Sequence, residues 1–129
     1  MPVVDPAIEE LYTAWREAFG RGDVRGVLAL LTPDYTLWPA GMPLIGIDGL
    51  RPQLEAAFAT YEIDSTFDRI ECIVSGHVAV DCGWDVQVVR PKSGGQTVTR
   101  RQRVWVILRR GNDARWRFAR GIAQPGPAA

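Results

Sequence analysis

The sequence feature that most constrains the fold is a change of hydrophobic period at Tyr61. Before Tyr61, apolar residues recur at the spacing of amphipathic helices, and after it apolar and polar residues alternate as in β-strands. The alternation predicts four long strands near residues 63–74, 78–90, 97–110 and 115–124. The turn sequences SGH, KSGG and GND separate these segments, so consecutive strands are expected to pair as antiparallel hairpins.

Two helices are expected near the N-terminus. Asp5-Pro6 is an N-cap followed by a proline at the first helical position, and Gly20 and Gly22 end the apolar pattern of the first helix. Asp23 caps a short second helix, which is expected to end at Thr32-Pro33 because the residue before a proline disfavours helical geometry.

A third helix is expected after two short extended segments, DYTLWP and AGMPLIG. Asp48 is its predicted N-cap, and Phe58 belongs to its buried stripe. The order of elements therefore predicts an α+β fold, in which three N-terminal helices pack on one face of a bent antiparallel sheet.

The length and composition fit one domain. A chain of 129 residues with 47% hydrophobic content can bury a single core, so residues 1–129 are expected to form one domain with a core over 5–124 and a frayed tail at 125–129. No window approaches the roughly 18 apolar residues of a membrane span, and the N-terminus lacks a basic segment followed by an apolar run. We therefore expect a soluble, cytoplasmic protein that does not bind membranes.

The charge is unevenly distributed, although the formal net charge is zero. Residues 1–85 hold fourteen acidic residues and five arginines, whereas residues 86–129 hold nine arginines, one lysine and one acidic residue. Such asymmetry can indicate an acidic or nucleic-acid partner, or two halves that neutralise each other within the fold or across a dimer. An excess of arginine over lysine is also what codon usage in a high-GC bacterial genome produces.

Eight of the fourteen arginines lie in residues 99–121, interleaved with aromatic residues. Three interpretations are open: a nucleic-acid strip, a pocket for a charged ligand, or strands whose arginines face solvent or pair with acids. Arg100, Arg101 and Arg103 straddle both faces of one strand, and the neighbouring aromatics are expected on the apolar face. We therefore do not expect nucleic-acid binding.

Cysteine and histidine offer little chemistry. Cys72 and Cys82 flank the SGH hairpin in a register that sends the two thiols to opposite faces of the sheet, so no disulfide is expected. His77, the single histidine, is expected in an exposed turn. No zinc-ligand spacing and no glycine-rich phosphate loop is present, so we expect neither a metal nor a cofactor.

The favoured pairing across the KSGG turn is the three-residue hairpin, which places Trp84 opposite Val104 and Asp85 opposite Arg103. One face of the sheet is then apolar. The other face collects small residues, one tryptophan and a few charges, as a ligand cavity requires, although plain solvent exposure or a dimer surface would also fit. The residues expected on this second face are Asp81, Gly83, Asp85, Gln87, Arg101, Arg103, Trp105, Ile107, Ala119, Gly121 and Ala123.

Two stretches carry a family resemblance: EAFGRGDVRGVLALLTPDYTLWPAGMPLIGIDGL and RQRVWVILRRGNDARWRFARGIA. Together they resemble the SnoaL-like and ketosteroid isomerase-like branches of the nuclear transport factor 2-like superfamily. The resemblance implies a cone-shaped sheet in a cystatin-like arrangement. The closing pattern also resembles the association domain of calcium/calmodulin-dependent kinases, a non-catalytic oligomerising member, so the fold leaves the activity open.

The functional residues of ketosteroid isomerases are mostly missing. Their general base precedes a proline at the end of the first strand, where this chain has Trp38-Pro39. Their oxyanion donors, a tyrosine and a protonated aspartic acid, correspond to positions near Trp15 and near Arg103 or Trp105. The resemblance therefore does not imply isomerase chemistry of that type.

Two function classes remain. The first is an acid–base enzyme of isomerase, cyclase or hydrolase type that acts on a small organic ligand, with Asp85 or Asp81 as the base and Arg103 placing an oxyanion. The second is a non-catalytic ligand-binding or oligomerisation module. Both would form a homodimer, and the expected ligand-binding residues are Trp15, Trp38, Phe58, Asp85, Arg101, Arg103 and Trp105.

Overall fold

The computed structural model describes residues 4–126. It contains three helices, α1 (Pro6–Arg21), α2 (Val24–Leu28) and α3 (Ile47–Thr60). Its strands are β1 (Leu31–Trp38), β2 (Ile45–Gly46), β3 (Tyr61–Ser75), β4 (Val78–Pro91), β5 (Val98–Arg110) and β6 (Trp116–Pro125).

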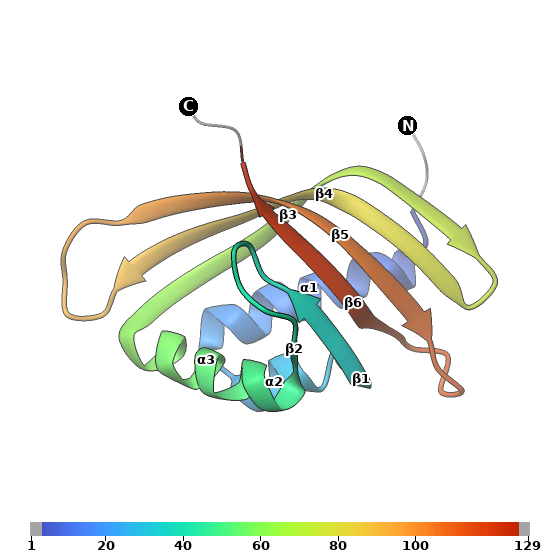
Figure 1. The fold of residues 1–129 in the computed structure, drawn as a ribbon, viewed down its shortest axis with the longest axis horizontal. Coiled ribbons are helices and arrows are strands. Elements are labelled where there is room, and N and C mark those ends of the chain that lie inside the picture. Colours follow the sequence, from blue (N-terminus) through green and yellow to red (C-terminus); the bar gives the residue numbers. More distant parts are fainter. Residues whose placement is uncertain (1–3, 127–129) are drawn as a thin grey trace.

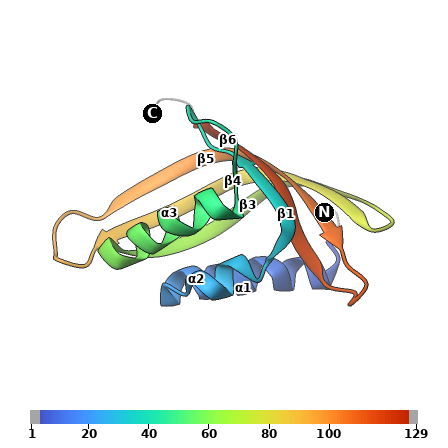
Figure 2. The ribbon, with the colours of Figure 1, turned by 60° about the horizontal axis from the view of Figure 1, so that its bottom comes forward.

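The strands form one curved sheet in the order β2-β1-β6-β5-β4-β3. The sheet arches over the helices, all of which lie on one face (Figures 1 and 2). This arrangement confirms the predicted α+β fold. One strand pair differs from the expectation of an antiparallel sheet, because β1 runs parallel to β6.

Local signals explain where the first two helices begin and end. The Asp5 side chain accepts a hydrogen bond from the Ala7 amide at 2.9 Å, and Gly22 closes α1 in a left-handed conformation with φ of 62°. The α2 helix is shorter than expected. It ends at Leu28 rather than at Thr32-Pro33, because the chain from Leu31 onward already pairs with β6.

The start of α3 also differs from the prediction. Its N-cap is Gly46, which makes no side-chain capping bond, and Asp48 lies within the first turn instead of capping the helix. There its negative charge still interacts favourably with the positive end of the helix dipole.

The core lies between the helices and the inner face of the sheet. Phe19 of α1 packs edge-on against Phe58 of α3, with ring centroids 5.1 Å apart. Residues from the last two strands close the core from the sheet side. Its large buried members are Ile8, Leu11, Phe19, Leu31, Tyr35, Leu50, Leu54, Phe58, Ile63, Leu108, Trp116 and Phe118.

The β3–β4 hairpin has the predicted register. Cys72 lies opposite Asp81 and Cys82 opposite Glu71, and both cysteines are free. A bulge in β3 just before Glu71 is accommodated by Gly83, where an added Cβ would come within 2.2 Å of a backbone oxygen.

The predicted β4–β5 register is wrong by one residue. Trp84 lies opposite Arg103, and Asp85 lies opposite Gln102. The reason is the connecting loop, which is wider than a three-residue turn and contains two consecutive glycines with positive φ, Gly94 at 89° and Gly95 at 126°. Asp85 and Arg103 therefore lie on opposite faces of the sheet and do not form the expected pair.

At the GND hairpin, alternation predicts Trp116, Phe118 and Ile122 on the same face as Val104, Val106 and Leu108, and the β5–β6 pairing agrees with this only in part. Phe118 lies opposite Leu108 on the inner face, but a bulge at Ala119 shifts the following pairs. Ile122 consequently lies opposite Trp105 on the outer face, instead of beside the inner apolar residues.

The strand β6 extends into the segment that was expected to fray. It continues to Pro125, and the Gly126 amide donates to the Arg101 carbonyl at 3.2 Å, while residues 127–129 lie outside the described part of the chain. Within residues 4–126, no helix has both the length and the apolar composition needed to cross a membrane.

Candidate functional site

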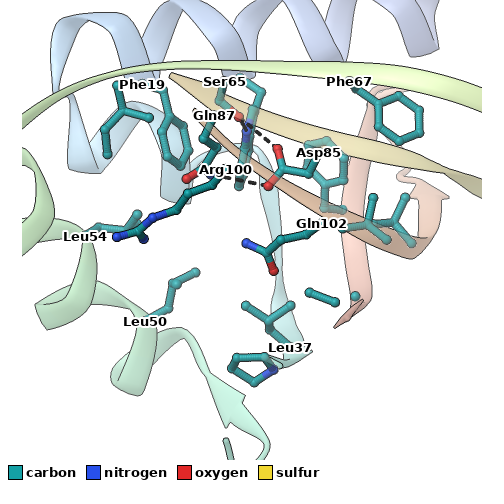
Figure 3. A pocket seen from close by; sticks show the side chains of 18 of the residues that line it. Phe19, Leu37, Leu50, Leu54, Ser65, Phe67, Asp85, Gln87, Arg100 and Gln102 are labelled. Atoms are coloured by element: carbon teal, nitrogen blue, oxygen red, sulfur yellow. Dashed lines mark hydrogen bonds between the residues drawn. The ribbon is translucent and has the colours of Figure 1, made fainter. Parts of the chain in front are cut away.

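A cavity of about 350 Å³ lies between the helices and the inner face of the sheet. Most of its wall is apolar. Aromatic rings come from Tyr12, Trp15, Phe19, Phe67 and Phe118, and aliphatic side chains come from Leu37, Leu50, Leu54, Val104 and Val106. Figure 3 shows the strands on one side of this space and α3 on the other. A small, largely apolar organic molecule suits such a wall.

A polar cluster centred on Asp85 interrupts the apolar wall. The Ser65 hydroxyl donates to Asp85 Oδ1 at 3.2 Å, and Gln87 Nε2 donates to Asp85 Oδ2 at 3.3 Å (Figure 3). The Trp15 indole N–H donates to Ser65 Oγ at 3.2 Å. Because an indole nitrogen can only donate, it occupies a lone pair of Ser65 and leaves the hydroxyl hydrogen for Asp85.

This environment changes the acidity of Asp85. Burial raises the pKa of the Asp85 carboxyl to about 6, and the hydrogen bond from Ser65 opposes part of this rise. Among residues 4–126, no arginine or lysine forms an ion pair with Asp85. A carboxylate whose pKa lies near neutrality can both accept and return a proton under physiological conditions.

Asp81, the other base expected from the sequence, has a different environment. Its side chain is fully buried, and Arg69 binds it with two hydrogen bonds, from Nε at 2.9 Å and from a terminal nitrogen at 2.8 Å. The Tyr12 hydroxyl adds a third at 2.8 Å. Arg69 also contacts Glu9. Asp81 is thus fully engaged and does not line the cavity, so it is not available as a base there.

Tyr12 contributes its ring to the cavity rather than its hydroxyl. The ring stacks on Phe67 with centroids 4.6 Å apart, and both line the cavity. Burial first, and the neighbouring Asp81 second, raise the pKa of Tyr12 well above its usual range. The hydroxyl therefore remains protonated and bonded to Asp81.

Two of the seven expected ligand-binding residues line the cavity, Trp15 and Asp85. Phe58 lies in the core behind the wall, where it packs on Phe19. Trp38 is 52% exposed and lies opposite Ile122 on the outer face, so its neighbour Leu37 faces the cavity instead.

Arg101, Arg103 and Trp105 also lie on the outer face, because the β4–β5 register is shifted from the expected one. The Arg101 guanidinium lies 4.1 Å from the centre of the Trp84 ring. Arg103 therefore cannot place an oxyanion in the cavity, which corrects the role expected from the sequence.

Sequence reasoning missed Ser65, Arg100 and Gln102 as residues of the cavity wall. The sequence holds no signal that selects Arg100 and Gln102, because Arg101 and Arg103 are also polar and two positions apart on the same strand. Pairing polar faces therefore fits the expected register as well as the observed one.

Metal ligands do not gather at this site. The described residues contain no group of three histidine, cysteine, aspartate or glutamate side chains that could hold a metal ion. The polar side chains of the described cavity wall include those of Tyr35, Tyr61, Ser65, Asp85, Gln87, Arg100 and Gln102.

Comparisons with known proteins agree with this architecture. A family model of the SnoaL-like domain matches residues 12–119. No curated protein matches the chain.

Among solved structures, a conserved protein from Planctomyces limnophilus DSM 3776 is similar, with a TM-score of 0.85 and 22% identity over 94% of this chain and 96% of that one. A ketosteroid isomerase-like protein from Erwinia carotovora atroseptica SCRI1043 has a TM-score of 0.76 and 24% identity, over 95% and 96% of the two chains. A nuclear transport factor 2-like superfamily protein from Salmonella enterica serovar Typhimurium LT2 has a TM-score of 0.79 and 14% identity, over 96% and 92%. Similarity at these identities shows a shared fold, and the activity has to be argued from the residues of the site.

Proposed function

The chain belongs to the family of SnoaL-like domains, and on that premise we propose that it binds a small organic molecule in its cavity and transfers a proton through Asp85. One observation carries the proposal: a half-buried carboxylate without a cationic partner among the described residues, oriented by Ser65 and Gln87, in the wall of an apolar cavity. A structural role alone would not favour a charged group at such a place, because burying an unpaired charge destabilises the fold. A cytoplasmic location is part of the same proposal.

The reaction that fits these groups is removal of a proton from carbon next to a carbonyl group. Asp85 accepts the proton, and negative charge then develops on the carbonyl oxygen. Gln102 lies directly opposite Asp85 and lines the same cavity, so its amide N–H can donate to that oxygen. Asp85 can then return the proton to the same carbon or to a different one, which would exchange or isomerise the ligand.

Hydrogen exchange of a neutral ketone tests this function. The probe is 1-tetralone, a bicyclic ketone with acidic C–H bonds beside its carbonyl group, dissolved with the protein in D₂O near pD 7. We expect the protein to accelerate the loss of these C–H signals in proton NMR spectra. The Asp85→Asn variant should reduce the acceleration about 10²–10⁴-fold, the usual contribution of a general base.

The same experiment separates an enzyme from a binding module. Calorimetry reports whether 1-tetralone binds, and NMR reports whether it exchanges. Binding without accelerated exchange would leave the non-catalytic alternative. Equal exchange rates with the wild-type protein and with Asp85→Asn would contradict the role of Asp85, and absence of both binding and exchange would count against the proposed function as a whole.

We propose further that two copies of the chain associate through the outer face of the sheet. A row of apolar residues crosses three strands there, because Trp38 lies opposite Ile122, and Ile122 lies opposite Trp105. All three are exposed, with Trp105 at 55%. A contiguous apolar patch of this kind is typical of a protein–protein contact, and a symmetric pair of identical patches covers itself.

Light scattering tests the association. The monomer mass is 14.3 kDa, so a dimer should have about twice that mass at micromolar concentration. Trp105→Glu should return the monomer mass, because it introduces a charge at one end of the row. Val98→Glu is the matched control, since Val98 is similarly exposed and on the same strand, but alternation places it on the opposite face of β5. A wild-type monomer would contradict this part of the proposal.

A further inference from the structure

Of the eight arginines in residues 99–121, one faces the cavity and seven do not. Arg100 lines the cavity, and it is the single arginine among its wall residues within the described chain. Five of the others have partners elsewhere. Arg109 and Arg120 contact Asp34, Arg117 contacts Asp113, Arg101 lies over Trp84, and Arg110 contacts His77.

The position of Arg100 relative to Asp85 follows from the strand register. Arg100 lies opposite Gln87, and Gln102 lies opposite Asp85, so the two pairs are neighbours on the inner face. Two residues along a strand separate them, which corresponds to about 6.6 Å. In Figure 3 the Arg100 guanidinium extends away from Asp85 towards Leu54 of α3. The Gln102 side chain projects into the cavity between the strands and α3.

The side chain of Arg100 is exposed to solvent, and that of Gln102 is half-buried. In the part of the chain that the structure describes, neither side chain makes a hydrogen bond, and Arg100 forms no ion pair. A ligand that fills the cavity would cover part of the guanidinium and remove water from it. Such a contact is unfavourable unless the ligand supplies an acceptor, and a carboxylate is the acceptor that best fits the planar guanidinium group.

We propose that the ligand of this cavity is a carboxylic acid, whose carboxylate binds Arg100 while its acidic C–H bond faces Asp85 and its carbonyl oxygen faces Gln102. This inference rests on the proposed function, since it names the substrate class of the same site. The carboxylate and Asp85 repel each other, so the ligand must hold its two reacting ends apart. A small keto acid with a rigid apolar body, such as an aromatic ring, meets this requirement.

Two ligands that differ only in charge provide the test. In 4-acetylbenzoate a ring separates a carboxylate from an enolisable acetyl group, and 4-acetylbenzamide replaces that carboxylate with a neutral planar amide. Their dissociation constants are measured by calorimetry with the wild-type protein, Arg100→Gln and Arg101→Gln. The third protein is a matched control, because Arg101 carries the same charge on the adjacent residue but lies on the outer face.

We expect the wild-type protein to bind the benzoate roughly 10- to 100-fold more tightly than the amide, as for one charge-assisted contact. Arg100→Gln should abolish this preference without weakening the binding of the amide, and Arg101→Gln should retain it. Arg100→Lys, which keeps the charge but loses the planar fork, should retain part of it.

Three results would overturn the inference. In the first, the wild-type protein shows no preference for the benzoate over the amide, and in the second this preference survives Arg100→Gln. In the third, Arg101→Gln loses the preference as fully as Arg100→Gln does, which would indicate a long-range charge effect. The failure of the proposed function has a different signature. If the amide and 1-tetralone bind but the benzoate has no advantage, the carboxylate subsite is wrong and the cavity still binds ligands. If none of the three compounds binds, both proposals fail.

Discussion

Two aspartates on β4, four residues apart and on the same face of the sheet, have opposite environments. Asp81 is fully buried and accepts hydrogen bonds from Arg69 and Tyr12. Asp85 faces the cavity, accepts hydrogen bonds from Ser65 and Gln87, and has no cationic partner among the residues that the structure describes. The residue type and the strand are the same, so the neighbours alone decide the role of each carboxylate.

The comparison shows how one strand supplies both structure and chemistry. At Asp81 the partly buried Arg69 guanidinium compensates the charge, and the ion pair joins α1 to β3 and β4 through Tyr12 and Arg69. At Asp85 the charge is left uncompensated, and burial raises its pKa to about 6. A carboxylate held in an ion pair has a structural role, whereas an unpaired, half-buried carboxylate is suited to proton transfer.

The largest difference between the two sites should appear on removal of the charge. Asp81→Asn leaves the Arg69 guanidinium without its buried partner but still paired with Glu9, so we expect a loss of about 3 kcal/mol in the free energy of unfolding, the lower end for a broken buried ion pair. Asp85→Asn removes an uncompensated charge and should change stability at pH 7 by less than about 1 kcal/mol or increase it. Urea denaturation of both variants measures the contrast, and similar losses for the two would show that their environments do not differ in this way.

The second effect is a pH dependence that belongs to Asp85. Its folded-state pKa of about 6 lies above its ordinary value of 3.8, so its protonated form favours the folded state. The resulting stabilisation is fully present below about pH 4 and is lost as the pH rises through 6. A shift of about two units corresponds to roughly 2–3 kcal/mol.

The Asp85→Asn variant cannot ionise at this position, so it is the reference for the pH dependence of the wild-type protein's stability. Urea denaturation at pH 4 and pH 8 should show that the stability of Asp85→Asn relative to the wild-type protein rises by that amount as the pH increases. A constant difference between the two proteins over this range would show that Asp85 has no raised pKa.

A smaller effect is expected from the Tyr12 hydroxyl. Tyr12→Phe keeps the ring stacked on Phe67 but removes one of the donors to Asp81, so we expect a loss of about 1.5 kcal/mol in the free energy of unfolding. Tyr35→Phe is the control, because Tyr35 also lines the cavity but its hydroxyl makes no hydrogen bond within residues 4–126. Equal losses in the two variants would argue against a specific bond to Asp81.

The smallest expected effect is a change in acidity without a large change in stability. Ser65→Ala removes a donor that favours the ionised form of Asp85, so the pKa of Asp85 should rise further, by roughly half a unit to one unit. Carboxyl-carbon NMR titration measures the shift. Thr66→Val should leave the pKa of Asp85 unchanged, because the Thr66 hydroxyl donates to the Val86 carbonyl instead.

The sequence predicts where the two aspartates lie, but it does not predict their different environments. Alternation along β4 places Asp81 and Asp85 on one face, and the two-residue turn at Gly76 and His77 sets the β3–β4 register correctly. The α+β plan follows from the change of period at Tyr61. These features are local, so a few neighbouring residues determine them.

The rest of the site depends on backbone geometry that residue patterns do not specify. The glycine pair at Gly94 and Gly95 allows several loop conformations, and the one adopted sends Arg100 rather than Arg101 into the cavity. The bulge at Ala119 likewise sends Ile122 outward. The wrong β4–β5 register and the unexpected bulge each place the side chains of a strand segment on the opposite face from the one expected. A shift of one residue is enough, because successive side chains point to opposite faces.

The decisive experiment for the proposed proton transfer is the titration of Asp85 itself. Carboxyl-carbon NMR of the wild-type protein, with Asp85→Asn used to assign the resonance, should give a pKa of about 6 for Asp85. Such a value would establish that the cavity holds an unpaired, half-buried carboxylate suited to proton transfer near neutral pH. A pKa near the ordinary value of 3.8 would contradict the proposal, because Asp85 would then be a solvated or charge-compensated group like any surface aspartate.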